Sequence, residues 1–321
     1  MKVKVYLSFD VEMWTNNWAE LDARFESSFQ RYYFGRSPAG DYALPKTLEI
    51  LDRHGLKGVF FVEPLFSARF GAQHLDTVTG LIGQAGQDIQ LHIHPEWTDE
   101  IRPPLIDDIS RKRQHLTYYT LAEQTTLIGA ARQRLEASIG HPVTTFRAGS
   151  YAVNRDTFQA LRANGIALDS SLNACYDLSE GTLEGMDACD SLRQIDGVTS
   201  YRVTVFRDGL GRLRPANVGA CSFAEMKQAL LDAQRRGVRH FVIVSHNFEL
   251  LKPGSSEPDR IVVARFEKLC RFLAAHPSEF EVGSYGQPAT APAQAPAEPR
   301  PQVSRSATAW RFAEQAARRF L

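Results

Sequence analysis

The sequence predicts an α/β fold, a distorted parallel (β/α) barrel of seven or eight strands. Along residues 1–286, short apolar runs alternate with helical patterns that carry readable start signals. The chain has 321 residues, a length at which α/β barrels commonly form one domain. Hydrophobic residues make up 43% of the chain, which is enough apolar material for a full core.

Eight apolar runs predict the strands, and the last of them is weaker than the others. They occupy residues 2–10, 57–63, 88–94, 143–149, 166–171, 201–206, 239–246 and 279–285. Parallel neighbours in such a fold are joined by helices.

Capping signals predict where several of the intervening helices begin. Thr120 with Glu123, and Ser222 with Glu225, fit a capping box, in which hydroxyl and carboxylate each satisfy a free backbone donor. Asn154 is placed to cap the helix that follows the fourth strand. These signals support alternation of strands and helices throughout the barrel.

Two stretches interrupt the alternation. Residues 13–43 contain a dense set of aromatic side chains, including Trp14, which either line a binding groove or form a helical lid packed on the barrel. Residues 172–200 contain several glycines and are expected to form a long loop.

The composition changes after residue 286. Residues 287–306 are rich in Pro and Ala and predict a stiff, extended linker. Residues 307–321 predict a basic amphipathic tail helix with apolar Trp310 and Phe312. We favour a peripheral membrane or partner contact for this helix over the alternative that it folds back on its own domain.

Charge and hydropathy exclude several classes of protein. Lys plus Arg and Asp plus Glu number 37 each, which argues against a nucleic-acid partner recognised by bulk charge. The chain contains no run of about 18 apolar residues, the length needed to span a membrane. The first ten residues alternate polar and apolar side chains instead of forming a signal-peptide block, so we expect a cytoplasmic protein, with membrane association through its tail as an alternative.

The candidate site lies where apolar strands end in polar residues, because barrels carry catalysis at those ends. The first strand ends in Asp10 and Glu12, which share one face with Cα atoms about 6–7 Å apart. Two such carboxylates repel unless a cation or an arginine lies between them. The third strand ends in His92 and His94, again on one face. A carboxylate and two imidazoles predict a catalytic metal site.

Later strands add groups that suit acid–base chemistry. Arg147 leaves the fourth strand, where it could pair with Asp10, and a glycine and Tyr151 follow it in a close turn. The fifth strand ends at Asp169. His246 ends the strand at 239–246 and is a candidate proton donor or acceptor, although a core histidine bonded to a carbonyl is an alternative.

The order of these strand-end motifs along the chain resembles that of the metal-dependent polysaccharide deacetylases, a family that includes chitin and peptidoglycan deacetylases. The resemblance covers residues 1–286. The matching motifs are SFDVE (8–12), LHIHPEW (91–97), FRAGSY (146–151), LDSS (168–171) and VSHNFEL (244–250).

The resemblance implies a role for each matched residue. Asp10 would be the general base, and Arg147 would orient it. His92 would be the first metal histidine, Tyr151 would help to bind the oxyanion, and His246 would be the general acid. We also expect substrate contacts from four residues in or near these motifs: Trp14, Glu96, Trp97 and Asp169.

Two departures from the family pattern leave the metal ligands open. Val11 stands where the family usually has its metal-binding aspartate, so Glu12 must substitute. The family's metal histidines are usually four residues apart, whereas here His94 follows His92 by two and Glu96 follows it by four. We rank Glu12 with His94 first, because strand alternation aims both inward.

The resemblance implies a metal-dependent hydrolase, most simply with Zn²⁺, that removes an N-acetyl group from an amino sugar in polysaccharide or glycan-precursor biosynthesis. Because no secretion signal is recognised, an acetylated sugar on a nucleotide or lipid carrier fits better than a mature wall polymer. Two alternatives remain open. One is an inactive carbohydrate-binding protein, and the other is a deformylase-like amide hydrolase with a non-sugar substrate.

Overall fold

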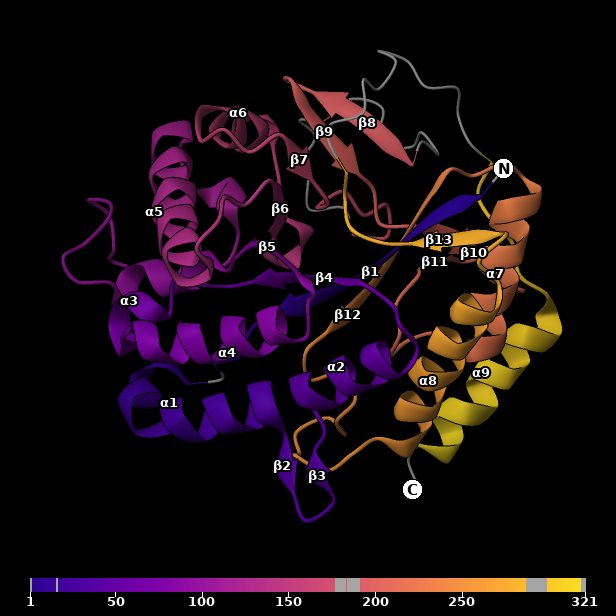
Figure 1. The fold of residues 1–321 in the computed structure, drawn as a ribbon. Helices are drawn as coiled ribbons and strands as arrows, with labels where there is room; N and C mark the ends of the chain where they lie inside the picture. The colour runs from indigo at the N-terminus through magenta and orange to yellow at the C-terminus, as the bar shows by residue number, and fades with distance from the viewer. Residues whose placement is uncertain (1, 16, 177–182, 184–190, 287–298, 319–321) are drawn as a thin grey trace. The chain divides into compact units, whose positions relative to one another are not determined.

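The computed structural model describes residues 2–15, 17–176, 183, 191–286 and 299–318 (Figure 1). The chain divides into two compact units. The first comprises Met1–Gly58, Phe206–Gly283 and Arg300–Leu321, and the second comprises Val59–Val205 and Ser284–Pro299.

The first unit is built on a central strand, β1 (Val3–Val11). Two strands from the end of the chain, β12 (His240–His246) and β13 (Phe280–Val282), pair with it in parallel. Two small two-stranded sheets accompany them. One pairs β2 (Arg36–Ser37) with β3 (Gly40–Asp41) in antiparallel orientation, and the other pairs β10 (Val205–Arg207) with β11 (Leu213–Pro215).

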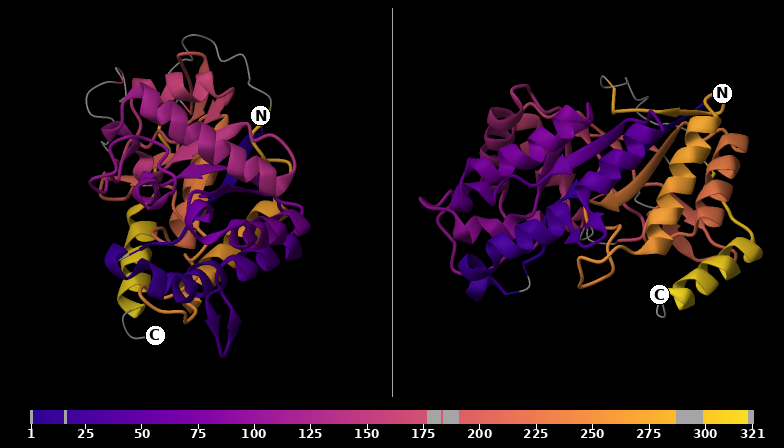
Figure 2. Two further views of the ribbon diagram at one scale, coloured as in Figure 1. Left: turned by 90° about the vertical axis from the view of Figure 1, so that its left-hand side faces the viewer. Right: turned by 60° about the horizontal axis from the view of Figure 1, so that its bottom comes forward.

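Helices of the first unit precede or follow these strands. They are η1 (Trp18–Glu20), α1 (Leu21–Phe29), η2 (Gln30–Phe34), α2 (Leu44–Arg53), α7 (Phe223–Arg235), α8 (Arg260–Ala275) and α9 (Arg305–Ala317). The predicted capping box of Ser222 and Glu225 forms at the start of α7. Helix α7 packs against both α8 and α9, and the three lie side by side in Figures 1 and 2.

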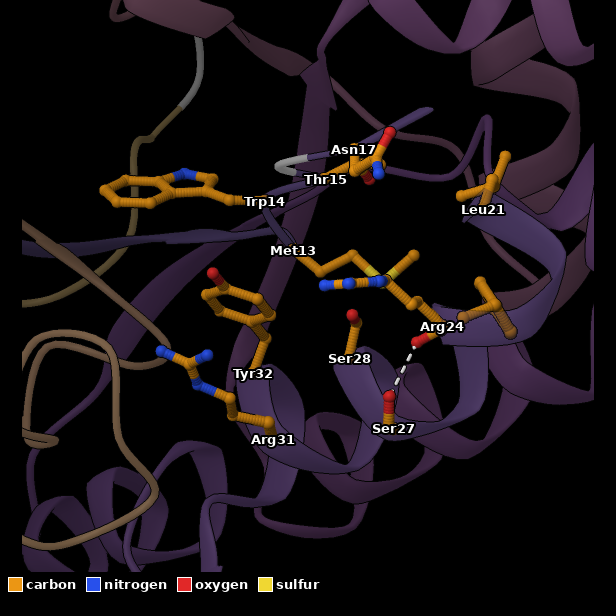
Figure 3. Close-up of a pocket in the computed structure, with 11 residues that line it drawn as sticks. Met13, Trp14, Thr15, Asn17, Leu21, Arg24, Ser27, Ser28, Arg31 and Tyr32 are labelled. Atoms are coloured by element: carbon orange, nitrogen blue, oxygen red, sulfur yellow. Dashed lines mark hydrogen bonds between the residues drawn. The ribbon is translucent and has the colours of Figure 1, made fainter. Parts of the chain in front are cut away.

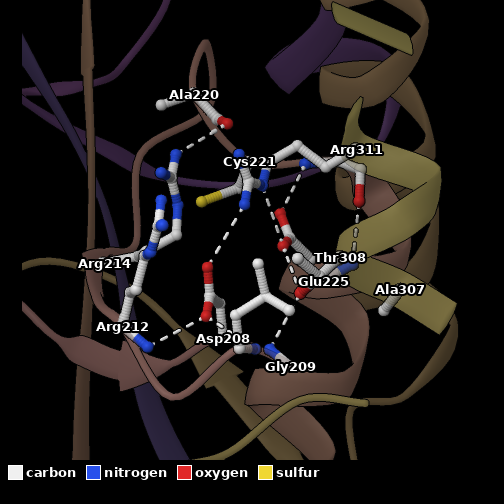
Figure 4. Close-up of polar contacts among 12 residues, drawn as sticks. Asp208, Gly209, Arg212, Arg214, Ala220, Cys221, Glu225, Ala307, Thr308 and Arg311 are labelled. Atoms are coloured by element: carbon white, nitrogen blue, oxygen red, sulfur yellow. Dashed lines mark hydrogen bonds and ion pairs between the residues drawn. The ribbon is translucent and has the colours of Figure 1, made fainter. Parts of the chain in front are cut away.

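The tail helix α9 folds back on its own unit, which was the alternative we ranked second. Arg311 is buried and donates to Glu225 at 3.0 Å and to Asp208 at 3.3 Å (Figure 4). Trp310 and Phe312 instead point outward, with 58% and 45% of their surface exposed. The two carboxylates offset the desolvation cost of burying this arginine.

The segment just before α9 is also bound to the first unit. The N–H of Arg207 donates to the carbonyl of Pro301 at 2.9 Å, and the N–H of Val303 donates to the carbonyl of Arg207 at 3.0 Å. The last residues of the predicted linker therefore run along β10. Residues 287–298 of that linker lie outside the described residues.

The second unit continues the parallel pattern. Strands β4 (Gly58–Val62), β5 (Asp88–Ile93), β6 (Thr145–Ala148), β7 (Leu168–Asp169) and β9 (Val198–Tyr201) are parallel neighbours in this order, and β8 (Leu192–Ile195) is antiparallel to β9. Its helices are α3 (Ser67–Phe70), α4 (Ala72–Gln84), η3 (Pro95–Glu100), η4 (Leu116–Tyr118), α5 (Leu121–Ile139), η5 (Gly149–Tyr151) and α6 (Arg155–Ala163).

These mostly parallel strands with helical connections confirm the predicted fold class, an α/β fold of the distorted parallel barrel type. The capping signals at Thr120 and Asn154 are also confirmed, because both side chains accept from the third backbone N–H of their helices. None of the helices that the structure describes combines the length and the apolarity needed to cross a membrane.

Two predictions about the stretch between β7 and β10 are wrong. The predicted strand at 201–206 is divided, since β9 ends at Tyr201 and β10 begins at Val205. The expected loop over 172–200 contains the β8–β9 hairpin, which turns at Asp196 and Gly197 with φ of 46° and 88°. Residues 177–182 and 184–190 of that loop lie outside the described part of the chain.

Candidate functional site

In the first unit, the carboxyl ends of β1 and β12 bring Asp10 opposite His246. Asn247 fixes this end of the strand pair. Its N–H donates to the carbonyl of Asp10 at 3.1 Å, and its side-chain oxygen accepts from the N–H of Glu12 at 3.1 Å. Its amide group donates to the carbonyl of Tyr32 at 2.7 Å. Sequence analysis gave no role to Asn247, although it lies in the motif at 244–250.

Glu12 is a buried carboxylate with two close neighbours. Its Oε1 accepts a hydrogen bond from the indole N–H of Trp14 at 2.7 Å and lies 3.8 Å from Nε2 of His246.

His246 lies among three carboxylates. Its Nδ1 is 2.9 Å from Oε2 of Glu249. Burial alone would lower the pKa of His246, but the hydrogen bond and charge of Glu249, with the charges of Glu12 and Asp10, outweigh it and raise the pKa to about 9. The imidazole therefore holds a proton at neutral pH, which is the state that a general acid requires. Glu249 is a further residue that the sequence analysis did not assign.

Aromatic side chains surround this histidine. Its ring stacks on Phe248 at 5.1 Å between centroids, and Trp14 meets the same phenylalanine at 4.9 Å. Trp14 is 50% exposed, and its indole lies beside both Glu12 and His246. This position agrees with the substrate contact expected of Trp14.

In the second unit, the ends of β5 and β6 hold His92 opposite Arg147. Nδ1 of His92 lies 2.8 Å from the carbonyl of Arg147, and the side chain is buried. A carbonyl can only accept, so this contact assigns the ring proton to Nδ1 and makes Nε2 the ring atom that carries the lone pair. Metal-binding histidines are commonly fixed by a hydrogen bond of this kind.

His94 lies beside His92, with ring centroids 5.0 Å apart. Its backbone N–H donates to the carboxyl of Glu63, and its Nδ1 is 3.3 Å from Oε2 of Glu96. Glu63 is buried, and burial raises its pKa to about 8 despite the hydrogen bonds from His94 and Leu65. Glu63 ends a predicted apolar strand, so the rule that found Asp10 and His92 could also have found it.

The turn after β6 is shaped around His94. A Cβ atom at Gly149 would lie 2.8 Å from the ring of His94, so only glycine allows this approach. Ser150 and Tyr151 both have left-handed backbones, with φ of 56° and 58°. Such conformations cost on the order of 1–3 kcal/mol each in residues other than glycine, and they concentrate at functional sites.

Arg147 is held rigidly. It is fully buried, and its guanidinium lies 4.2 Å from the centroid of the Phe61 ring. Its Nε donates to the carbonyl of Ser170 at 2.9 Å, and its Nη2 donates to the Ser170 hydroxyl at 3.0 Å. A buried arginine with fixed geometry suits the orienting role implied by the family resemblance.

Two of the residues expected to contact substrate, Asp169 and Trp97, have buried side chains. Asp169 is fully buried, and its carboxylate accepts from the N–H of Ser171 and from the hydroxyls of Ser171 and Ser200. Burial raises its pKa against these hydrogen bonds. Trp97 is 2% exposed and packs near Phe66. Both side chains therefore have partners within the fold, and their contact with substrate stays a prediction.

Comparison of this chain with known proteins identifies its fold through similarity to solved structures. No family model and no curated protein matches this chain. Among solved structures, the chain resembles a candidate polysaccharide deacetylase from Mycobacterium smegmatis with a TM-score of 0.50 and 20% identity, over 90% of this chain and 95% of that chain. The chain has the polysaccharide deacetylase fold. This agrees with the resemblance carried by the five sequence motifs.

Two further structures with this fold are more distant. A family 4 carbohydrate esterase from Streptomyces lividans, in complex with acetate, matches with a TM-score of 0.44 and 14% identity, over 88% of this chain and 92% of that chain. A family 4 pseudoenzyme from Bacillus anthracis matches with a TM-score of 0.40 and 12% identity, over 87% of this chain and 63% of that chain.

The donors carried on this polysaccharide deacetylase fold fit a divalent metal ion. The first unit supplies a carboxylate, Glu12, and the second unit supplies two imidazoles, His92 and His94. Two imidazoles with a carboxylate suit Zn²⁺ and leave positions for water. The contact of His92 Nδ1 with a carbonyl supports this fit, since it makes Nε2 the ring atom that carries the lone pair. Glu96, the other candidate ligand, is 3.3 Å from the ring of His94.

Proposed function

We propose that the chain is a metal-dependent carbohydrate N-deacetylase, a hydrolase of linear amide bonds that acts on an N-acetylated amino sugar. The observation that carries the proposal is the position of a carboxylate, Asp10, opposite a histidine, His246, at neighbouring strand ends. A base and an acid in adjacent positions are what amide hydrolysis requires.

In the proposed site, Glu12, His92 and His94 would hold Zn²⁺ or a similar divalent ion. When bound, such an ion supplies positive charge that polarises a carbonyl and lowers the pKa of water from about 15.7 towards about 7. Asp10 accepts a proton from the attacking water, whose oxygen joins the acetyl carbon. His246 donates a proton to the nitrogen as the amide C–N bond breaks. The products are acetate and a free amino sugar.

Two residues of the second unit have supporting roles in the proposal. Arg147 orients the general base, for which its fixed guanidinium is suited. A backbone N–H near Tyr151 binds the oxyanion. Ser150 and Tyr151 have left-handed backbones, so the N–H groups of this turn point in directions that helices and strands do not provide.

The proposed function is tested by acetate release. Purified protein loaded with zinc is incubated with N-acetylglucosamine derivatives, and acetate and free amine are measured. The matched control is Asp10→Asn, which keeps the side-chain shape and removes the proton acceptor. Formyl release from formylated sugars or small amides, without acetate release, would favour the deformylase-like alternative. Bound zinc with no hydrolysis would favour the inactive carbohydrate-binding protein, which the Val11 departure suggests.

The proposed substrate is linked to a nucleotide or lipid carrier in the cytoplasm. Contact with a membrane through the tail would then depend on Trp310 and Phe312, because Arg311 is committed to Glu225 and Asp208. Flotation with anionic liposomes tests this part. If Trp310→Ala with Phe312→Ala leaves flotation unchanged, or if the intact protein does not float, the tail makes no membrane contact.

A further inference from the structure

A pocket lies within the first unit, beside the exposed indole of Trp14 (Figure 3). Its volume is about 210 Å³. Trp14, Tyr32 and Arg31 form one side of it, and Arg24 and Leu21 lie on the other side. The polar side chains that line it include Thr15, Asn17, Arg24, Ser27, Ser28 and Arg31.

The charged side chains that line this pocket are positive. Arg24 and Arg31 contribute to the lining, and none of the described lining residues is acidic. Arg24 pairs on the exposed surface with Glu20, which is outside the lining. Arg31 is half-buried, lies 5.1 Å from the centroid of the Tyr32 ring and has no carboxylate partner among the described residues. An arginine in this setting can bind an oxyanion with two parallel hydrogen bonds.

The helical segment over 21–34 presents these groups on one face. Arg24, Ser28 and Arg31 are spaced by four and three residues, which aligns side chains along a helix. Arg31 lies in η2 (Gln30–Phe34), a π-helical turn that directly continues α1. Single π-helical turns are rare and are frequently found at functional sites.

Trp14 connects the pocket with the proposed catalytic centre. The indole forms part of the pocket wall, and its N–H donates to Oε1 of Glu12, a proposed metal ligand, at 2.7 Å. A sugar that contacts Trp14 while its acetamide is hydrolysed would therefore place a substituent next to this pocket. The arginines would meet whatever group is attached at that position.

We propose that this pocket is a subsite for an anionic substituent, a phosphate ester or a carboxylate, on the acetylated sugar. Arg31 and Arg24 bind the oxyanion, and Ser28 donates a further hydrogen bond. The inference rests on the proposed deacetylase function, since it names the substrate class of that site. It adds that neutral amino sugars are the poorer ligands.

The test measures binding without turnover. Zinc-loaded Asp10→Asn protein is titrated by calorimetry with N-acetylglucosamine 1-phosphate, N-acetylmuramic acid and neutral N-acetylglucosamine. At least one anionic sugar should bind about tenfold more tightly than the neutral sugar, because hydrogen bonds between charged groups are the stronger ones. Preference for the phosphate or for the carboxylate sugar identifies which anion the subsite takes.

Arginine variants then locate the effect. Arg31→Gln, and separately Arg24→Gln, should remove most of this preference and leave the affinity for N-acetylglucosamine unchanged. Arg36→Gln is the matched control, since Arg36 is an exposed arginine of the same unit outside the pocket. Equal binding of all three sugars, or equal weakening of all three by Arg31→Gln, overturns the subsite.

The two proposals can fail separately. Anion-dependent binding that needs Arg31, without acetate release by the unmodified protein from any of the three sugars, overturns the deacetylase function and retains the anion site. Acetate release with no preference for an anionic sugar retains the function and overturns the subsite.

Discussion

Asp10 and His246 lie opposite each other in the register of the parallel strands β1 and β12. The two strands are joined at this end by Asn247, whose N–H donates to the carbonyl of Asp10 at 3.1 Å. Because strand register is fixed along the whole pair, the relative position of these two side chains is set by the core of the unit and not by a loop. A base and an acid held in this way need little reorganisation before reaction.

Replacing the proposed base should abolish turnover without loss of metal. Asp10→Asn keeps the shape of the side chain and removes its capacity to accept a proton, so acetate release should fall by about 10²–10⁴-fold. Metal content after dialysis should equal that of the unmodified protein. Near-normal activity would show that Asp10 is not the base, and Glu12 or Glu96 would then be the next candidates.

Removing either histidine should weaken metal binding. His92→Ala and His94→Ala each delete one of three proposed ligands, so zinc should be lost on dialysis and activity should return in part with excess metal. Glu96→Ala is the informative comparison, because Glu96 occupies the position that the family's second histidine usually takes. Full metal retention by His94→Ala together with loss by Glu96→Ala would replace His94 with Glu96 in the site.

The tail should contribute to the stability of the first unit. Arg311→Ala leaves Glu225 and Asp208 buried without their cation, and the loss of one partner from a buried ion pair typically costs about 3–5 kcal/mol in free energy of unfolding. Urea denaturation measures this cost. Arg305→Ala, an exposed change at the start of the same helix, should cost less than about 0.5 kcal/mol. Equal stability of the two variants would mean that α9 is not an integral part of the unit.

His240 should make the folded state sensitive to acid. Burial, with the charges of Arg239 and Lys4, lowers the pKa of His240 from 6.5 to about 4. The folded protein therefore binds fewer protons than the unfolded chain between these values. The contribution of His240 to the free energy of unfolding is fully present above about pH 6.5. It is lost as the pH decreases towards 4, by about 1–3 kcal/mol in total.

The variant His240→Gln isolates this contribution. The difference in free energy of unfolding between pH 7 and pH 4.5 should be smaller in His240→Gln than in the unmodified protein, even if the variant loses the contact of Nδ1 with the Tyr6 hydroxyl at 3.0 Å. An unchanged difference would assign the acid sensitivity to other groups.

Local signals in the sequence predicted local structure well. The side chains of Thr120, Asn154 and Ser222 accept from the backbone N–H groups that their capping patterns indicated, because a cap involves residues only three positions apart. The β8–β9 hairpin was missed although Asp196 and Gly197 form a strong two-residue turn signal between apolar runs. The glycine-rich composition around it had suggested a loop.

Contacts between distant residues could not be predicted in the same way. The sequence indicates that α9 is amphipathic. Only the positions of Glu225 and Asp208 in the folded chain explain why the side chain of Arg311 points inward. The burial of Asp169 and Trp97 likewise depends on neighbours from other segments. Asp10, Glu12, His92 and His246 could be selected as candidates because each lies at the carboxyl end of a predicted parallel strand. That position can be recognised without knowing which other residues each side chain contacts.

Acetate release by the zinc-loaded protein tests the central proposal most directly. With an N-acetylated amino sugar that carries a phosphate or a carboxylate, the account predicts acetate and free amine in equal amounts. This activity should be lost on chelation, restored by zinc and absent from Asp10→Asn. Stoichiometric zinc binding without release of acetate or amine from any N-acetylated sugar would contradict it.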